Sequence, residues 1–169
     1  TWRNAPIEEL HAAVKLQGNE VRVLNMEVAQ GPDWLRGKGV LKVGEGWAYQ
    51  GELHANVRDL GRYAALLQPP LGIDAYAGGY AGGVELDWTG KGDAQGNEGS
   101  VRARFSQLRP VNPRQNWQNP FNGELAGSYN KEGVEIESLS LGDGQVQLRT
   151  GMKIGPEGVR FPRLTLSHG

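Results

Sequence analysis

The sequence has no cysteine and only three histidines, which removes most of the residues that form disulfides, thiolate nucleophiles and zinc sites. His11, His54 and His168 lie far apart and share none of the short spacings typical of metal-binding motifs. No run of apolar residues approaches the ~18 needed for a membrane-spanning helix, and no signal-peptide pattern opens the chain. We therefore expect no bound metal and no membrane-spanning helix in this stretch.

The balance of charge and the lack of catalytic motifs limit the functions open to the chain. The 18 basic and 19 acidic residues give a formal net charge of −1, whereas nucleic-acid binding needs a concentrated basic face. There is no GxSxG motif, and the Gly-Lys-Gly triplets at 37–39 and 90–92 lack the rest of a phosphate-binding loop, so both are read as turns. Glu135 and Glu137 fall on the polar side of a strand-like segment, which favours solvated carboxylates over an acid-base pair. We predict no enzyme activity, no cofactor and no nucleic-acid partner.

Alternation of apolar and polar residues is the main pattern in the sequence. In VEIESLSLGDGQVQLRTGMKI, residues 134–154, the alternation continues on both sides of a Gly-Asp-Gly turn. Successive side chains of a β-strand point to opposite faces, so this pattern predicts strands with one apolar face. The residues predicted to form that face are Val21, Val23, Met26, Val28, Leu41, Val43, Leu53, Val57, Val84, Leu86, Trp88, Val101, Ala103, Phe105, Val134, Ile136, Leu139, Leu141, Val146, Leu148, Met152, Ile154, Val159, Phe161, Leu164 and Leu166.

Short glycine-rich turns separate the strand-like segments. Gly-Asn, Gly-Pro-Asp, Gly-Asp-Gly and Gly-Pro-Glu-Gly supply the backbone conformations that tight turns need. Strands joined by tight turns pair antiparallel, so we predict a mostly antiparallel sheet. The segments 72–83 and 89–100 are read as glycine-rich connectors, the second containing a hairpin loop. A length of 169 residues predicts a single unit over residues 1–169.

One segment has the period of a helix. In RDLGRYAALLQPP, Leu60, Tyr63, Ala64 and Leu67 recur at helical spacing, and two prolines follow. This predicts a short amphipathic helix between strands. The opening segment PIEELHAAV fits a helix or a strand on local grounds.

Two long stretches of the sequence follow one order of elements. The first is IEELHAAVKLQGNEVRVLNMEVAQGPDWLRGKGVLKV followed by GELHANVRDLGRYAALL, and the second is GELAGSYNKEGVEIESLSLGDGQVQLRTGMKIGPEGVRFPRLTLSHG. This order resembles a recurring motif of the AsmA-like superfamily, especially its TamB (translocation and assembly module) branch. The motif consists of a strand, a Gly-Asn turn, a strand, a glycine, a strand and a helix that contains the sequence pairs Asp-Leu and Leu-Leu. By this resemblance, residues 10–16 are expected to form a strand.

The resemblance implies a fold, a location and a function. Members of the family are envelope proteins of Gram-negative bacteria, built as a curved sheet that forms an open, taco-like groove with an apolar interior. That groove is implicated in shielding phospholipid acyl chains between the inner and outer membranes. On this basis the chain is expected to be a β-rich fragment of a longer periplasmic protein that is anchored in the inner membrane. The apolar residues above would line the groove, the short helix would lie over it, and an outer-membrane assembly-barrel protein is a further implied partner.

Two other interpretations fit the same pattern. A β-sandwich shows the same alternation, with its two apolar faces closed against each other and no ligand between them. The five tryptophans also fit a carbohydrate-binding or adhesin-like β-sandwich module, because exposed aromatic rings stack on sugars. Trp117, in a loop rich in proline and asparagine, is the better candidate for such a contact, whereas Trp88 is in phase with apolar neighbours.

Overall fold

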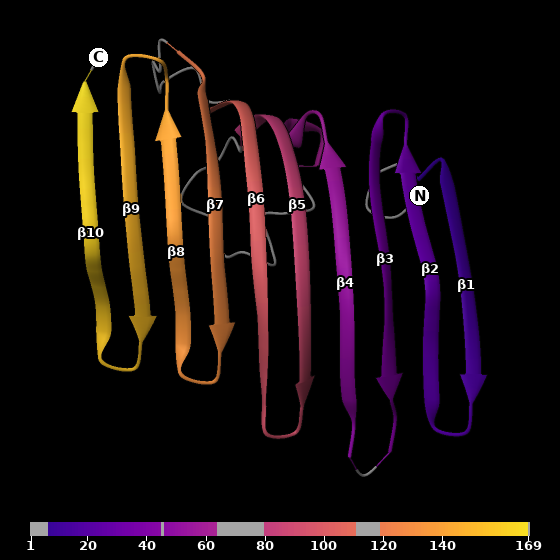
Figure 1. Cartoon of the computed structure of the whole chain (residues 1–169). Helices are drawn as coiled ribbons and strands as arrows, with labels where there is room; N and C mark the ends of the chain where they lie inside the picture. The colour runs from indigo at the N-terminus through magenta and orange to yellow at the C-terminus, as the bar shows by residue number, and fades with distance from the viewer. Residues whose placement is uncertain (1–6, 45, 64–79, 111–118, 169) are drawn as a thin grey trace.

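The computed structural model describes residues 7–44, 46–63, 80–110 and 119–168, and these residues form one β-sheet (Figure 1). The sheet has ten strands in the order β1 to β10, and each strand pairs antiparallel with the next one in the sequence. The end strands β1 and β10 lie far apart, so the sheet is not closed. The predicted mainly β, antiparallel fold is confirmed. The strands are β1 (Glu9–Gln17), β2 (Glu20–Gln30), β3 (Asp33–Lys42), β4 (Ala48–Val57), β5 (Tyr80–Asp93), β6 (Gly96–Pro110), β7 (Phe121–Asn130), β8 (Gly133–Gly142), β9 (Val146–Gly155) and β10 (Gly158–His168).

The described residues build a single layer rather than an enclosed core. The main contacts of each strand are with its sequence neighbours, and a sheet facing this one is absent from the described part of the chain. Ala103, with 9% of its surface exposed, is accordingly the one buried apolar residue found there. A closed β-sandwich needs two facing sheets. The described residues therefore lack the second layer that this alternative requires.

Polar side chains fix several of the hairpin turns. Asp93, Asn130 and Asp143 each accept a hydrogen bond from the backbone N–H two residues ahead, at 2.7, 2.8 and 2.9 Å. This local bonding is the reason that aspartate and asparagine favour turns. Asp143 also accepts a bond from the N–H of Val146 at 2.8 Å. These N–H groups, that of Val146 first, lower the pKa of the Asp143 carboxyl.

A β-bulge accounts for the break in the alternation of β2. The pairing with β3 shifts between Val23 and Met26, so that Leu24 and Asn25 lie opposite the single residue Lys38. The Asn25 side chain accepts a hydrogen bond from the backbone N–H of Ala13 at 3.1 Å. A bulge adds one residue to one strand, so the apolar residues on both sides of it return to the same face.

Two glycine-rich segments that the sequence suggested to be turns or connectors are strands. The triplets 37–39 and 90–92 lie inside β3 and β5, and the hairpin turn between β5 and β6 contains only the residues between Asp93 and Gly96. The interpretation of both triplets as turns was therefore wrong. At 90–92 aromatic rings pack on the glycines, as described below, whereas at Gly37 the side chain of Leu53 occupies the space that a Cβ atom would take.

The predicted helix is not confirmed. Its described part is one turn of 3₁₀-helix, η1 (Leu60–Tyr63), while Ala64 and Leu67 lie outside the described residues. The opening segment is a strand, β1, as the resemblance implied. No helix within the described ranges has the length and apolar character needed to cross a membrane.

Candidate functional site

The register of the strands gathers the predicted apolar residues on one side of the sheet, here called the apolar face. Residues directly opposite each other on neighbouring strands point to the same face. One row runs across Met26, Gly37, Leu53, Trp88, Val101, Gly127, Ile136 and Met152. The next row runs across Val28, Leu35, Ala55, Leu86, Ala103, Leu125, Leu139, Thr150 and Leu164.

Almost all of the residues predicted for this face fall into its rows. Val84 lies opposite Phe105 and Val57, and Leu148 lies opposite Leu141 and Leu166. Val43 is past the end of β3, and Phe161 sits where the pairing of β9 and β10 shifts, so neither has a paired position.

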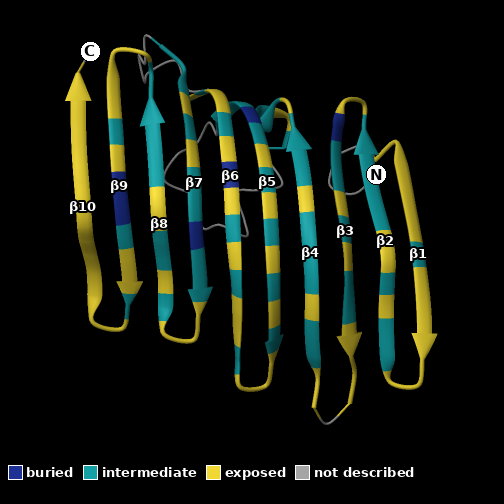
Figure 2. Cartoon of the chain, viewed as in Figure 1, coloured by how far each residue is buried: buried dark blue, intermediate teal, exposed yellow. Residues whose placement is uncertain are grey.

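Exposure of the apolar face rises from its middle to both ends. Leu86, Trp88 and Val101 are half-buried, and their neighbours along β5 and β6 that point to the other face are exposed (Figure 2). At the ends, Leu16 on β1 is 73% exposed and Leu166 on β10 is 70% exposed. Single exposed apolar residues are ordinary, but these belong to rows that continue across the sheet.

A row of four glycines crosses the middle of the sheet. Gly39, Gly51, Gly90 and Gly99 are paired in sequence across β3, β4, β5 and β6, and Tyr129 on β7 continues the row. A Cβ atom on Gly99 would lie 2.7 Å from the hydroxyl oxygen of Tyr129. One on Gly90 would overlap the ring of Trp88 and lie 2.8 Å from the same hydroxyl. The two aromatic rings thus occupy the space that side chains would fill at these glycines.

The aromatic residues over the glycines form one cluster. Trp88 Nε1 donates a hydrogen bond to Tyr129 Oη at 3.0 Å. Tyr49 covers Gly92, where a Cβ would lie 2.6 Å from its ring. Burial, followed by the proximity of Tyr129, raises the pKa of Tyr49. Rings that cover strand glycines restore the contacts that glycine cannot make, so this cluster stabilises the middle of the sheet.

The opposite side of the sheet, here called the polar face, carries ion pairs between neighbouring strands. One row runs across Lys38, Glu52, Thr89, Ser100, Ser128, Glu135, Lys153 and Arg160. Lys38 Nζ lies 2.8 Å from Glu52 Oε1, and Lys153 Nζ lies 2.8 Å from Glu135 Oε1. The hydrogen bond from Lys38 is the main reason that the pKa of Glu52 is lowered.

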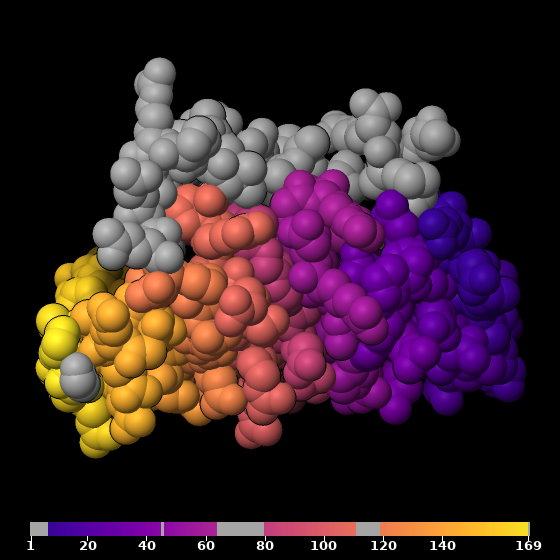
Figure 3. Space-filling model, turned by 90° about the horizontal axis from the view of Figure 1, so that it is seen from above, coloured from indigo at the N-terminus to yellow at the C-terminus, as the bar shows by residue number. Residues whose placement is uncertain are grey.

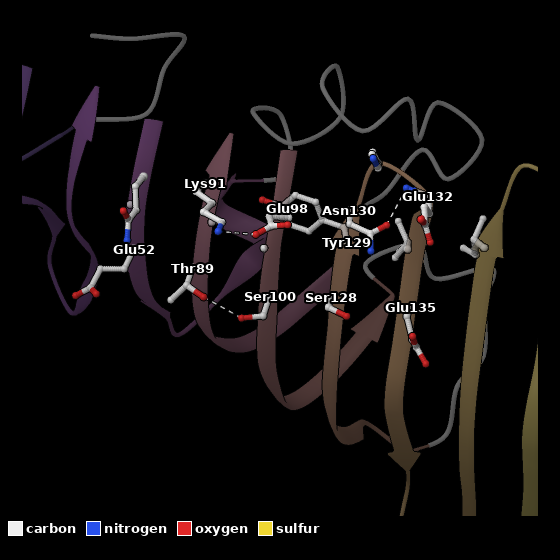
Figure 4. A pocket seen from close by; sticks show the side chains of 18 of the residues that line it. Glu52, Thr89, Lys91, Glu98, Ser100, Ser128, Tyr129, Asn130, Glu132 and Glu135 are labelled. Carbon is white, nitrogen blue, oxygen red and sulfur yellow. Dashed lines mark hydrogen bonds and ion pairs between the residues drawn. The ribbon is translucent and has the colours of Figure 1, made fainter. Parts of the chain in front are cut away.

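A groove of about 1420 Å³ lies on the polar face, and we call it the polar groove. It is lined by two rows of residues on the polar face, one on each side of the glycine row. On β5, Thr89 belongs to the first row and Lys91 to the second. The neighbouring row of the apolar face does not line the groove: its members Leu53, Trp88 and Val101 point to the other side of the sheet. Figure 4 shows Thr89, Ser100, Ser128 and Glu135 in line across successive strands. Leu24 and Val40 line the groove beside these polar side chains, so its lining is mixed, and the apolar groove interior expected from the sequence is not confirmed.

The described histidines and tryptophans contact charged or aromatic neighbours. His54 Nδ1 is 2.6 Å from Asp87 Oδ1 on the polar face, and within the described ranges no cluster of three or more potential ligands could hold a metal ion. Arg36 lies over the ring of Trp34, 4.6 Å from its centre, and Trp47 stacks on Tyr49 with ring centres 6.3 Å apart. Trp117 lies outside the described residues.

A buried carboxylate, which sequence reasoning missed, holds the turn after β4. Asp33 is 3% exposed and accepts hydrogen bonds from the backbone N–H of Arg58 and the hydroxyl of Tyr63, both at 2.8 Å. Burial and the Asp33 carboxylate raise the pKa of Tyr63 to about 12. The sequence signal is Asp33 itself, which follows Gly-Pro at the start of a strand. Its partners are 25 and 30 residues away, so the local pattern did not reveal the cluster.

Comparison of the chain with models of protein families, with curated proteins and with solved structures found no match.

Proposed function

We propose that the apolar face binds phospholipid acyl chains and that the chain is a segment of a bridge-like lipid-transport protein. The observation that carries the proposal is the continuity of the apolar rows across ten strands of one open sheet. A protein that needs only a stable fold closes such a face against a second layer. The large apolar residues Leu10, Leu16, Leu164 and Leu166 instead remain 62–73% exposed.

The energetics of lipid transfer suit such a surface. An acyl chain of about fifteen methylene groups costs roughly 12 kcal/mol to expose to water, at about 0.8 kcal/mol for each group. Contact with apolar side chains removes most of this cost without any directional bond. Because the attraction depends on the apolar area removed from water, an acyl chain moves along a uniform apolar face without being held at one tight site. Catalytic groups are not needed for this function.

The same proposal covers the setting of the protein. In the AsmA-like and TamB proteins that the sequence resembles, this activity belongs to the periplasm of Gram-negative bacteria, in proteins anchored in the inner membrane. We extend that setting to this chain, together with a role in outer-membrane protein assembly through contact with an assembly-barrel protein.

Photo-crosslinking in the full-length protein tests the proposal. A photoreactive amino acid at Leu86, Phe105 or Ile136, on the apolar face, is expected to form adducts with phospholipids in cells. The matched controls are at Asp87, Arg104 and Glu135, which neighbour these positions in sequence and point to the polar face. Mass spectrometry identifies the adducts. Equal lipid capture on both faces, or none at the three apolar positions, would refute acyl-chain binding here.

A further inference from the structure

The polar groove is a second surface feature that acyl-chain binding does not use. It lies on the face opposite the apolar rows and extends from Arg22 on β2 to Arg160 on β10. Strands of a sheet are spaced by about 4.8 Å, so eight steps from β2 to β10 give a length of about 38 Å. The backbone of the glycine row, at Gly51, Gly90 and Gly99, forms part of its floor.

The charges along the polar groove neutralise one another. Lys38 pairs with Glu52, Lys91 with Glu98 and Lys153 with Glu135, each at 2.8 Å. Acidic and basic side chains alternate in these pairs, so the groove has no extended region of one sign to attract a polyanion or a polycation. The surface therefore favours an uncharged ligand.

The middle of the groove carries hydroxyl groups on neighbouring strands. Thr89 Oγ1 and Ser100 Oγ are 2.9 Å apart, and Ser128 is paired with Ser100 on the next strand. Figure 4 shows these three side chains in line on β5, β6 and β7, with Glu52 and Glu135 beyond them at the two ends. Hydroxyl groups both donate and accept hydrogen bonds, and the carboxylates accept them. Such a row matches a ligand that carries many hydroxyl groups along its length.

We propose that the polar groove binds an uncharged, linear oligosaccharide that lies across the strands, with its hydroxyl groups bonded to Thr89, Ser100, Ser128, Glu52 and Glu135. An extended peptide fits less well, because the backbone groups of the floor are already paired in the sheet and cannot form a further ladder. The site uses none of the tryptophans that suggested sugar binding from the sequence, and Trp88 lies on the other face.

Titration followed by NMR and calorimetry tests this site. The probes are a neutral glucose hexasaccharide in its β-1,4 and α-1,4 forms, a sulfated oligosaccharide of the same length and a polar hexapeptide. We expect at least one neutral hexasaccharide to bind, with shifts at Thr89, Ser100 and Ser128. The double substitution Thr89→Val and Ser100→Ala should weaken binding about tenfold, because hydrogen bonds to the sugar are lost.

The matched control is Ser138→Ala, which removes a hydroxyl from the same face but outside the groove, and it should leave the affinity unchanged. Circular dichroism checks that each variant keeps the sheet. Stronger binding of the sulfated probe or the peptide would overturn the proposal, as would the absence of binding by either neutral sugar at 10 mM, a concentration about ten times a millimolar dissociation constant. Equal affinity of the double variant and the original protein would also overturn it. Loss of lipid capture by the apolar face would leave these outcomes unaffected.

Discussion

Replacement of Tyr63 by phenylalanine tests whether the buried Asp33 carboxylate fixes the turn after β4. The substitution removes only the hydroxyl that donates to Asp33 at 2.8 Å, and the Arg58 N–H bond remains. A hydrogen bond to a charged group contributes about 1.5–3 kcal/mol, and a buried carboxylate that loses one partner is poorly compensated. We expect Tyr63→Phe to lower the free energy of unfolding by about 2 kcal/mol at pH 7.

The raised pKa of Tyr63, caused first by burial and then by the Asp33 carboxylate, makes this region sensitive to pH. At 1.36 kcal/mol for each pH unit, a change from the ordinary 10.0 to about 12 sets an upper bound of about 2.7 kcal/mol on this effect, because solvent screens a side chain that is only partly buried. Because the folded pKa is the higher one, the unfolded chain loses this proton first as the pH rises. The stabilisation is therefore complete below pH 10 and is lost between pH 10 and about 12.

Urea denaturation followed by circular dichroism measures both effects. The difference in stability between the original protein and Tyr63→Phe should shrink by at most about 1.3 kcal/mol between pH 9 and pH 11, because only the original protein titrates at this position. A difference below about 0.5 kcal/mol at pH 7 that also stays constant up to pH 11 would show that Asp33 and Tyr63 do not interact as described.

Three further predictions follow from the two faces and the turns. Gly90→Ala should displace the aromatic cluster and shift tryptophan fluorescence to longer wavelength, whereas Gly46→Ala, with open space around it, should not. Val101→Asp should abolish lipid capture at a cost of about 1–3 kcal/mol in stability, while Arg102→Asp, on the other face, should preserve capture in the crosslinking assay. Asp143→Ala should lower the melting temperature at pH 7. Since the folded pKa of Asp143 is below the ordinary 3.8, this difference should fade as the pH decreases below 3.8, and a difference that is constant with pH would contradict its role.

The alternating pattern predicted the faces of the strands because side-chain direction in a strand is a local property. Val84, Leu86 and Trp88 must share a face wherever β5 lies in the sheet. The break in β2 at Leu24 was also visible in the sequence, and it is a bulge. Turn positions were less certain, because glycine serves both in turns and in strands that lie beneath aromatic rings.

The features that the sequence did not reveal depend on contacts between distant segments. Gly90 and Gly99 are strand residues because Trp88 and Tyr129, which are 41 residues apart, cover them. The polar groove likewise depends on the register that puts Thr89 and Ser100 side by side. A strand-by-strand pattern fixes neither the register nor the side on which the sheet is hollowed.

The strictly sequential order of the sheet has a consequence for how the chain unfolds. Since each strand depends mainly on the one before and the one after, stability accumulates hairpin by hairpin, much as in repeat proteins. Apart from the longer connections between β4 and β5 and between β6 and β7, this pairing needs only short loop closures, which favours rapid formation from whichever hairpin forms first. The outer hairpins, with one neighbour on a single side, should open before the centre, so hydrogen exchange should be fastest in β1 and β10 and slowest in β5 and β6.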